Sequence, residues 1–262
     1  MKIISSSDNP LIKQAWRLKK SVFRRKQAKF LVDGQREIKQ ALNQAWSCSA
    51  LFYNSELATE QNSIFDFVAN DKIIKIPKNL FFKLCYKEKP DGFLAIFEQK
   101  EIEFSDIKLS TPSLILVLDN VEKPGNLGAI IRTAQATGVE AIIVNQTQTD
   151  IYNPNVIRAS EGYVFSLPII KTTVEQTVEW LKQKKIKSFG ALTTANKSYL
   201  QVDFKGSVAI ILGSEAKGLS LKWINNLDQS LVIPMFSSMD SLNVSVAAGV
   251  ILYEVLRQRL EN

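Results

Sequence analysis

The sequence predicts an α/β protein whose sheet is mainly parallel, and two observations support this fold class. First, short apolar runs with strand character alternate with segments of helical periodicity along almost all of the 262 residues. Second, several runs, such as LILVL at 114–118 and SVAIIL at 207–212, are nearly continuous in apolar residues. Such runs are typical of parallel strands that are buried on both faces. Strands of this kind, joined by helices, form a sheet that helices cover on both sides.

The first hundred residues predict one alternating β/α unit. Residues 8–29 predict a single helix, which Asp8 or Asn9 can cap and in whose first turn Pro10 fits. Its apolar positions recur at helical spacing, and Lys and Arg fill the remaining faces. Further helical stretches are expected at 34–45, 63–69 and 78–84. Strands are expected at 30–32, 50–53, 73–76 and 93–97.

A break in the pattern divides the chain. Residues 98–112 are charged, end in Thr-Pro and lack a long apolar stretch, so we expect a linker there. The predicted domains are therefore 1–100 and 113–262, joined by 101–112. In the second half, strands are expected at 114–118, 141–144, 188–193, 207–212 and 230–234, and helices at 127–137, 174–185 and 245–260. Because ligands bind beyond the carboxyl ends of parallel strands, the loops after 118, 193, 212 and 234 are the expected location of a site.

Composition excludes several kinds of chemistry. The chain contains no histidine, which removes Ser-His-Asp and Cys-His nucleophile systems, histidine general bases and most zinc sites. Cys48 and Cys85 form no CxxC pair, and we expect them to be reduced thiols of a cytoplasmic protein without a metal. No apolar run approaches the ~18 residues that a membrane helix needs, so no membrane partner is expected.

Positive charge is concentrated at the amino terminus. The chain carries a formal net charge of +7. Residues 1–30 hold nine Lys or Arg against one acid, which makes that segment +8, and the remainder is −1. A concentrated positive field indicates a polyanion partner, RNA or DNA first. Two alternatives stay open from charge alone: a solvated helix face, and an organelle transit peptide.

Two of the candidate loops combine glycines with charged residues. The first reads DNVEKPGNLGAIIRTA at 119–134, where Asn126 is placed to cap a helix and Arg132 follows less than two turns later. A helix start attracts anions, although a plain capped turn with a surface arginine is the alternative. The second reads GSEAKG at 213–218 and holds Glu215 between two glycines, where a solvated loop acid is the alternative. Neither loop is a Walker motif or GxGxxG, which argues against a kinase or a nucleotide-dependent oxidoreductase.

The third candidate loop reads PMFSSMDSLNVSVAAG at 234–249. Ser241, Asn243 and Ser245 lead into the closing helix, and one such residue would suffice to cap it. Ala247 and its small neighbours then keep the surface of that helix thin, which suits close approach by a ligand or a backbone.

The three loops together resemble a known family. NLGAIIR, ILGSEAKG and IPMFSSMDSLNVSVAAGVILYE look like the three signature motifs of the SpoU/TrmH branch of the SPOUT RNA methyltransferases, in the same order and at similar spacing. FLVDGQREIKQAL at 30–42, with ISSSDNPLIK before it and PDGFLAIFE after it, resembles the L30e-like substrate-binding domain of that family. YNPNVIRASEGYVFSLPI at 152–169 resembles the family's segment between motifs one and two.

This resemblance implies a fold and an activity. It implies an amino-terminal L30e-like α/β domain and a carboxyl-terminal SPOUT α/β domain with a deep trefoil knot, assembled as a homodimer through the knot region. The implied reaction is transfer of a methyl group from S-adenosyl-L-methionine to a ribose 2′-hydroxyl of RNA. Ribosomal RNA is preferred over transfer RNA, and a non-catalytic RNA-binding protein on the same fold is the other alternative.

The resemblance also implies site residues. The implied catalytic residues are Arg132, Asn126, Glu215, Ser241 and Asn243. The implied cofactor-binding residues are Thr193, Leu212, Gly213, Ile233 and Leu242. The expected RNA contacts come from the basic helix and two further arginines: Lys13, Arg17, Lys19, Lys20, Arg24, Arg25, Arg36 and Arg158. Arg132 is expected to bind the ribose hydroxyl or its phosphate, because a guanidinium is very hard to deprotonate.

Overall fold

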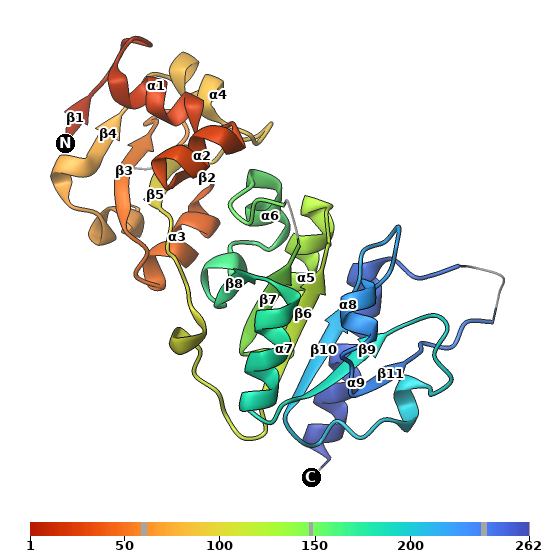
Figure 1. Ribbon diagram of the computed structural model, residues 1–262. Helices are drawn as coiled ribbons and strands as arrows, with labels where there is room; N and C mark the ends of the chain where they lie inside the picture. Colours follow the sequence, from red (N-terminus) through yellow and green to blue (C-terminus); the bar gives the residue numbers. More distant parts are fainter. Residues whose placement is uncertain (59–61, 147–148, 237–239, 262) are drawn as a thin grey trace. The chain divides into compact units, whose positions relative to one another are not determined.

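The computed structural model describes residues 1–58, 62–146, 149–236 and 240–261 (Figure 1). The chain forms two compact units. Unit 1 consists of Met1–Lys100 and Asp150–Ser166, and unit 2 consists of Glu101–Thr149 and Leu167–Asn262. The segment Asp150–Ser166 therefore packs in unit 1, although it lies between two strands of unit 2 in the sequence. The sequence analysis proposed domains at 1–100 and 113–262. That these two parts fold independently stays a prediction.

Unit 1 is built on a five-stranded mixed sheet with the order β1-β4-β3-β5-β2. β4 pairs in parallel with β1 and β3, whereas β5 pairs antiparallel with β3 and β2. The strands are β1 (Lys2–Ile3), β2 (Lys29–Asp33), β3 (Cys48–Tyr53), β4 (Ile73–Lys75) and β5 (Phe93–Glu98). The helices are α1 (Pro10–Arg17), α2 (Ser21–Gln27), α3 (Gln35–Asn43), α4 (Lys78–Leu84) and α6 (Pro154–Ala159).

The single helix expected over 8–29 is wrong, because the structure has α1 and α2 with a turn between them. Asn9 caps α1 by accepting a hydrogen bond from the Leu11 amide at 3.0 Å. Leu18, directly after α1, is fully buried in the core. Arg24 of α2 donates to the carbonyls of Leu18 and Lys19 at 2.8 and 3.0 Å. This side chain satisfies carbonyls that a continuous helix would have bonded internally.

An aromatic cluster joins Asp150–Ser166 to the rest of unit 1. The ring of Tyr152 stacks on Phe30 with centroids 4.4 Å apart, and Phe165 lies 5.7 Å from the same ring. The indole of Trp46 donates to the Phe165 carbonyl at 3.0 Å. All four side chains are buried, so burial of apolar area holds this segment on the sheet.

Unit 2 is built on a six-stranded sheet with the order β11-β9-β10-β6-β7-β8, and every pair in it is parallel. The strands are β6 (Leu114–Asp119), β7 (Ala141–Asn145), β8 (Ile169–Thr172), β9 (Lys187–Ala191), β10 (Val208–Leu212) and β11 (Gln229–Leu231). β6 and β10 are buried along their whole length, as their apolar sequences predict. The predicted α/β class with a mainly parallel sheet is confirmed, while the knot stays a prediction.

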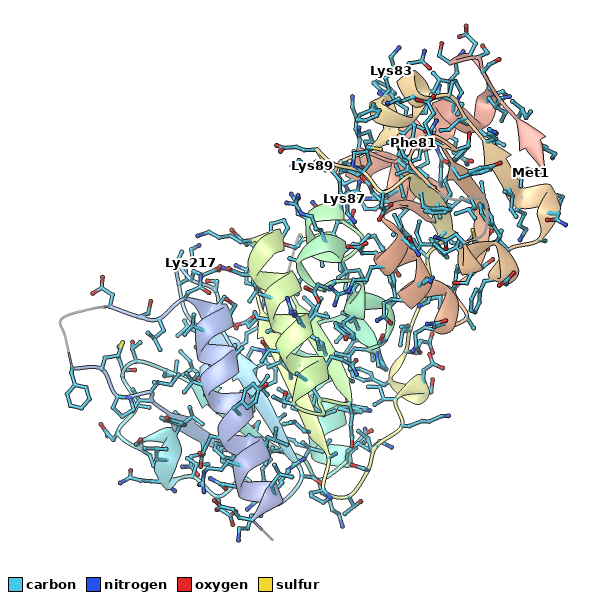
Figure 2. All side chains as sticks on the ribbon, turned by 180° about the vertical axis from the view of Figure 1, so that it is seen from behind. Met1, Phe81, Lys83, Lys87, Lys89 and Lys217 are labelled. Atoms are coloured by element: carbon cyan, nitrogen blue, oxygen red, sulfur yellow. The ribbon has the colours of Figure 1, made fainter. Side chains whose placement is uncertain are left out.

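Helices cover both faces of this sheet. The helices are α5 (Pro124–Ala136), α7 (Val174–Gln183), α8 (Leu221–Ile224) and α9 (Val244–Leu260). α5 and α9 pack against each other on one face, which Figure 2 shows from the side that they cover. On the other face, Trp180 and Trp223 join the core, and Phe104 stacks on Trp180 at 4.9 Å. In the described part of the chain, no helix has the length and apolar character needed to cross a membrane.

Candidate active site

A cavity of about 420 Å³ lies in unit 2 where β9, β10 and β11 end. Its walls come from the segments that follow these three strands and from the start of α9. The carboxyl ends of parallel strands meet at one edge of a sheet, and ligands of α/β proteins bind there. The cavity therefore occupies the place that the sequence analysis expected for a site.

All five residues proposed for the cofactor line this cavity. They are Thr193, Leu212, Gly213, Ile233 and Leu242. Two of the proposed catalytic residues, Glu215 and Ser241, line it as well. Ala247, which the sequence analysis named for close approach by a ligand, lines the cavity too. The sequence analysis missed several other lining residues: Leu192, Ser214, Lys217, Met235 and Asp240. Their position next to a strand end or a motif residue was the available signal. Figure 2 labels Lys217, which belongs to the loop after β10.

The loop after β10 folds back tightly on itself. The backbones of Ser214 and Gly218 exchange two hydrogen bonds, at 3.0 and 2.9 Å. A Cβ added at Gly213 would lie 2.1 Å from the carbonyl carbon of Gly218 and 2.3 Å from its oxygen. Gly218 itself has φ +66°, a conformation that side chains disfavour. The two glycines of the motif therefore permit a turn that places Glu215 beside the cavity.

Asp119 anchors the far end of the same loop, and the sequence analysis did not single it out. This residue ends β6, is 1% exposed, and accepts a hydrogen bond from the Ser220 amide at 2.7 Å. The available signal was an acid directly after the apolar run at 114–118. A buried carboxylate at that position requires a partner, and the returning loop supplies one.

Three polar side chains from three motifs form a connected chain. The amide of Asn126 donates to the Glu215 carboxylate, and its carbonyl accepts from the Asn243 amide at 3.3 Å. The expectation that Asn126 caps its helix is wrong, because α5 begins earlier, with Lys123 as its cap residue. Pro124 suits the first position of a helix, which moves Asn126 into the first turn. Its side chain is thereby free to join the other two motifs.

Asn243 also caps α9. Its side-chain carbonyl accepts from the Ser245 amide at 2.9 Å and from the Ser245 hydroxyl at 2.6 Å. Capping therefore uses the side-chain oxygen of Asn243, while its side-chain nitrogen donates to Asn126. Ser241 is exposed and lies on the cavity wall. The polar residues before α9 thus serve both the helix start and the site.

Arg132 is exposed on α5, six residues after Asn126. Over six residues an α-helix advances about 9 Å and turns by about 240°. Arg132 therefore points to another side of α5 than Asn126 does. The structure brings Asn126, Glu215 and Asn243 together and places Arg132 further along the same helix.

The residues proposed to contact RNA lie in unit 1, and they divide into exposed side chains and side chains that are bonded within the fold. Six of the eight side chains are exposed: Lys13, Arg17, Lys20, Arg25, Arg36 and Arg158. Lys13 pairs with Asp8 at 2.8 Å, and Arg36 pairs with Glu161. The amino group of Lys19 instead donates to the carbonyls of Cys85 and of Lys83, a residue labelled in Figure 2, at 3.0 Å each.

Arg24 has a structural role rather than the exposed one that the sequence analysis expected. It is 2% exposed, and its Nε lies 2.6 Å from the Asp150 carboxylate. With the two carbonyl contacts described above, the guanidinium is held from three sides. Arg24 therefore ties α2 to Asp150–Ser166 and offers no charge to a phosphate in this structure.

Neither a metal site nor a reactive thiol is found among the described residues. No group of three or more acids and cysteines in that part of the chain is placed to hold a metal ion. Cys48 and Cys85 are buried and unpaired. Burial raises the pKa of the Cys48 thiol to about 11 and raises that of Cys85 as well. Both therefore stay protonated and poorly nucleophilic near neutral pH.

A parallel sheet with a largely apolar cavity and a polar cluster at its carboxyl edge is typical of α/β enzymes that bind a cofactor. The model of the SpoU rRNA Methylase family matches residues 113–253, which is more than half of the chain. The model of the MRM3-like substrate binding domain matches residues 9–95. The chain belongs to the SpoU rRNA methylase family.

Known relatives cover nearly the whole chain. The chain is 27% identical to the 23S rRNA (guanosine(2553)-2′-O)-methyltransferase RlmP of Bacillus subtilis, over 97% of this chain and 99% of the relative. It is 31% identical to the 23S rRNA (uridine(2479)-2′-O)-methyltransferase of Streptomyces viridochromogenes, over 90% and 85%. A solved structure of an AdoMet-bound rRNA methyltransferase from Sinorhizobium meliloti matches with a TM-score of 0.89 and 26% identity, covering 98% of this chain and 97% of that one.

Proposed function

We propose that this protein is an S-adenosylmethionine-dependent methyltransferase that methylates a ribose 2′-hydroxyl of ribosomal RNA. The observation that carries the proposal is the cavity at the carboxyl ends of β9, β10 and β11, with the Asn126–Glu215–Asn243 chain beside it. Membership of the SpoU family and relatives named for 23S rRNA 2′-O-methylation support the reaction and the substrate class. The cytoplasm is the place of action that this proposal includes.

The cavity fits the cofactor in size and chemistry. Its volume of about 420 Å³ falls in the range of roughly 300–1,000 Å³ that ligand pockets have. The side chains of Leu212, Ile233 and Leu242 line it, which suits the faces of an adenine ring. Peptide groups at the strand ends suit the edge of that ring, and a cofactor without phosphates needs no cluster of cations. When bound, S-adenosylmethionine supplies an electrophilic methyl group on a sulfonium.

The polar residues orient the ribose and help remove its proton. We assign Arg132 to the ribose hydroxyl or the neighbouring phosphate, where its charge polarises the O–H bond. The proton then leaves to a phosphate oxygen or to water, because a guanidinium cannot act as a base near neutral pH. Asn126, Glu215 and Asn243 hold one another in a fixed arrangement, and Ser241 completes the cavity wall. Alignment of the oxygen with the methyl group accounts for most of the catalysis expected.

A homodimer is part of this proposal. α9 carries an exposed stripe in which Val246 is 50% and Tyr253 is 54% exposed, with half-buried Val250 between them. These residues recur at helical spacing, so they form one face, and an exposed apolar face is typical of a protein interface. Arg132 occupies another side of α5 than Asn126, and a site shared by two subunits would bring it to the partner's cavity.

The proposal is tested by incubating the protein with labelled S-adenosylmethionine and total RNA, then separating ribosomal from transfer RNA. Label is expected in ribosomal RNA. The variant Arg132→Ala should retain cofactor binding in calorimetry and lose at least about 100-fold in rate, as removal of a positioned charge from a transition state does. Turnover near that of the unmodified protein would remove the role assigned to Arg132. Label confined to transfer RNA would overturn the substrate class.

A further inference from the structure

α1 and the turn after it present a group of exposed residues that the proposed methyl transfer does not use. Lys13, Trp16 and Arg17 follow the spacing i, i+3 and i+4 in α1, and Lys20 lies in the turn that follows α1. All four side chains are exposed. The opposite face of α1 is buried through Ile12 and Ala15. Because the Lys20 amino group lies over the Trp16 ring, the four residues form one exposed surface, which we name the Trp16 stripe. α1 and α2 appear in unit 1 in Figure 1.

Trp16 is far more exposed than the other three tryptophans of this chain. It is 55% exposed, whereas Trp46, Trp180 and Trp223 are at most 6% exposed. An exposed indole among cations gains little from its own fold, because its apolar area stays in water. The amino group of Lys20 lies 5.9 Å from the centroid of the Trp16 ring. A flexible ammonium beside an aromatic face is the arrangement that binds a nucleotide, with its base on the ring and its phosphate on the cation.

The charge of this region selects the partner. Residues 1–30 carry a net charge of +8, whereas the rest of the chain carries −1. Arg24 is buried against Asp150, so the other cations of this segment supply its positive surface. A hollow next to the stripe is lined by Pro10, Leu11, Gln14, Arg17 and Gln27, so Arg17 belongs to both surfaces. The amides of Gln14 and Gln27 bond to each other at 2.9 Å and lie half-buried at this hollow. Amides of this kind can exchange that contact for the polar edge of a base.

We propose that the Trp16 stripe binds an unpaired segment of RNA, with one base stacked on Trp16 and the adjoining phosphates on Arg17 and Lys20. The inference rests on the proposed function, because it assigns part of the substrate RNA to this surface. An RNA duplex buries the faces of its bases, so only an unpaired nucleotide can use the indole. The site therefore distinguishes single-stranded from double-stranded RNA.

The test uses the full chain and two probes, a short single-stranded oligoadenylate and an RNA duplex of the same length. Trp16→Ala should weaken binding of the single strand roughly 5- to 150-fold, the range expected for loss of one stacked base. Trp16→Phe should restore most of this affinity. Binding of the duplex should not change, and the salt dependence should keep its slope because no charge is removed. Phe67→Ala is the matched control, since Phe67 is 52% exposed in the same unit.

Fluorescence gives a second readout. Quenching by iodide reports mainly on Trp16, because the other three tryptophans are buried. The single strand should protect Trp16 from iodide, and Trp16→Phe should abolish the protected signal. Equal affinities of Trp16→Ala and the unmodified protein for the single strand would overturn the inference. A change of oligomeric state in Trp16→Ala would also overturn it, by assigning the stripe to a protein contact. Methylation of ribosomal RNA by the unmodified protein separates these outcomes from failure of the proposed function.

Discussion

Two neighbouring arginines of α2 show that the surroundings of a side chain decide its role. Arg24 and Arg25 have the same side chain and lie in the same basic run, so sequence alone assigns them the same role. In the structure Arg24 is buried against Asp150, whereas Arg25 is exposed. The difference arises from Asp150, which lies 126 residues away along the chain. No local pattern contains that information.

Removing the partner of Arg24 should therefore affect stability, whereas removing the charge of Arg25 should affect RNA binding. Asp150→Ala leaves the Arg24 charge buried without its acid, which should lower the free energy of unfolding by roughly 3–5 kcal/mol. Arg25→Gln should change stability by less than about 0.5 kcal/mol, as expected for an exposed site. Arg25→Gln should instead reduce the slope of RNA affinity against salt. Urea unfolding and binding at several salt concentrations measure these effects, and equal stability losses at both positions would contradict the account.

Asp33 supplies a prediction about pH. Its Oδ2 accepts from the amides of Tyr86 and Lys87 at 2.7 and 2.9 Å, while its Oδ1 is buried and has no partner among the described residues. Burial raises the pKa of this carboxyl above its ordinary value of 3.8, although the two amide contacts oppose the shift. The native state therefore holds the proton more tightly than the unfolded state does. Its contribution to stability is present below the ordinary pKa and is lost as pH rises through the raised one.

Asp33→Asn removes this titration while keeping an oxygen for the two amides. The variant should gain stability relative to the unmodified protein as pH rises from about 4 to about 7. Urea unfolding of both proteins at the two pH values measures the difference. A difference that shrinks with rising pH would show that the Asp33 carboxylate is stabilised, not penalised, by its surroundings.

At the scale of elements, the tight turn of the loop between β10 and α8 places Glu215 beside the cavity. A side chain at Gly213 would collide with the backbone of Gly218, which the fold cannot move cheaply. Gly213→Ala should therefore open the loop, displace Glu215 and weaken cofactor binding at least about tenfold, which corresponds to about 1.4 kcal/mol. Gly206→Ala is the control, because a Cβ there meets nothing within 4 Å. Calorimetric titration compares the two, and equal affinities would contradict the assigned role of Gly213.

Most elements could be predicted from the sequence because they depend on local patterns. The continuous apolar runs predict β6 and β10 almost to the residue, and helical spacing predicts α7 and α9. The break between α1 and α2 could not be predicted, since every side chain there is compatible with a helix. It depends on Leu18 entering the core and on Arg24 bonding two freed carbonyls. The cap of α5 was missed for a smaller reason, because Pro124 begins the helix before Asn126.

At the scale of the whole molecule, sequence motifs predict which residues belong to the candidate site, but they do not predict which of these residues contact one another. Resemblance supplied Asn126, Glu215 and Asn243 from three separate stretches of sequence, and their contacts emerge only from the fold of unit 2. The placement of Asp150–Ser166 in unit 1 carries no sequence signal, because it depends on the stacking of Tyr152 and Phe165 on Phe30. Pairing between distant segments is what periodicity cannot reveal.

The proposed homodimer with a shared site predicts complementation between two impaired variants at a limiting cofactor concentration. Arg132→Ala keeps its cavity, and Gly213→Ala keeps its arginine. In a mixed dimer, one site would combine the intact cavity of the first with the Arg132 of the second. Co-refolded mixtures should therefore be more active than the average of the two variants measured separately. Absence of recovery, with mixed dimers verified by mass spectrometry, would place Arg132 and the cavity of one site in the same subunit.

The measurement that tests the central claim most directly identifies the product. Ribosomal RNA methylated by the unmodified protein with labelled S-adenosylmethionine is digested to nucleosides, which are then separated and identified by mass. The account predicts that the label appears in a single 2′-O-methylnucleoside. Label on a base would contradict the ribose chemistry assigned to Arg132 and its neighbours, while leaving the fold and the cofactor cavity as described.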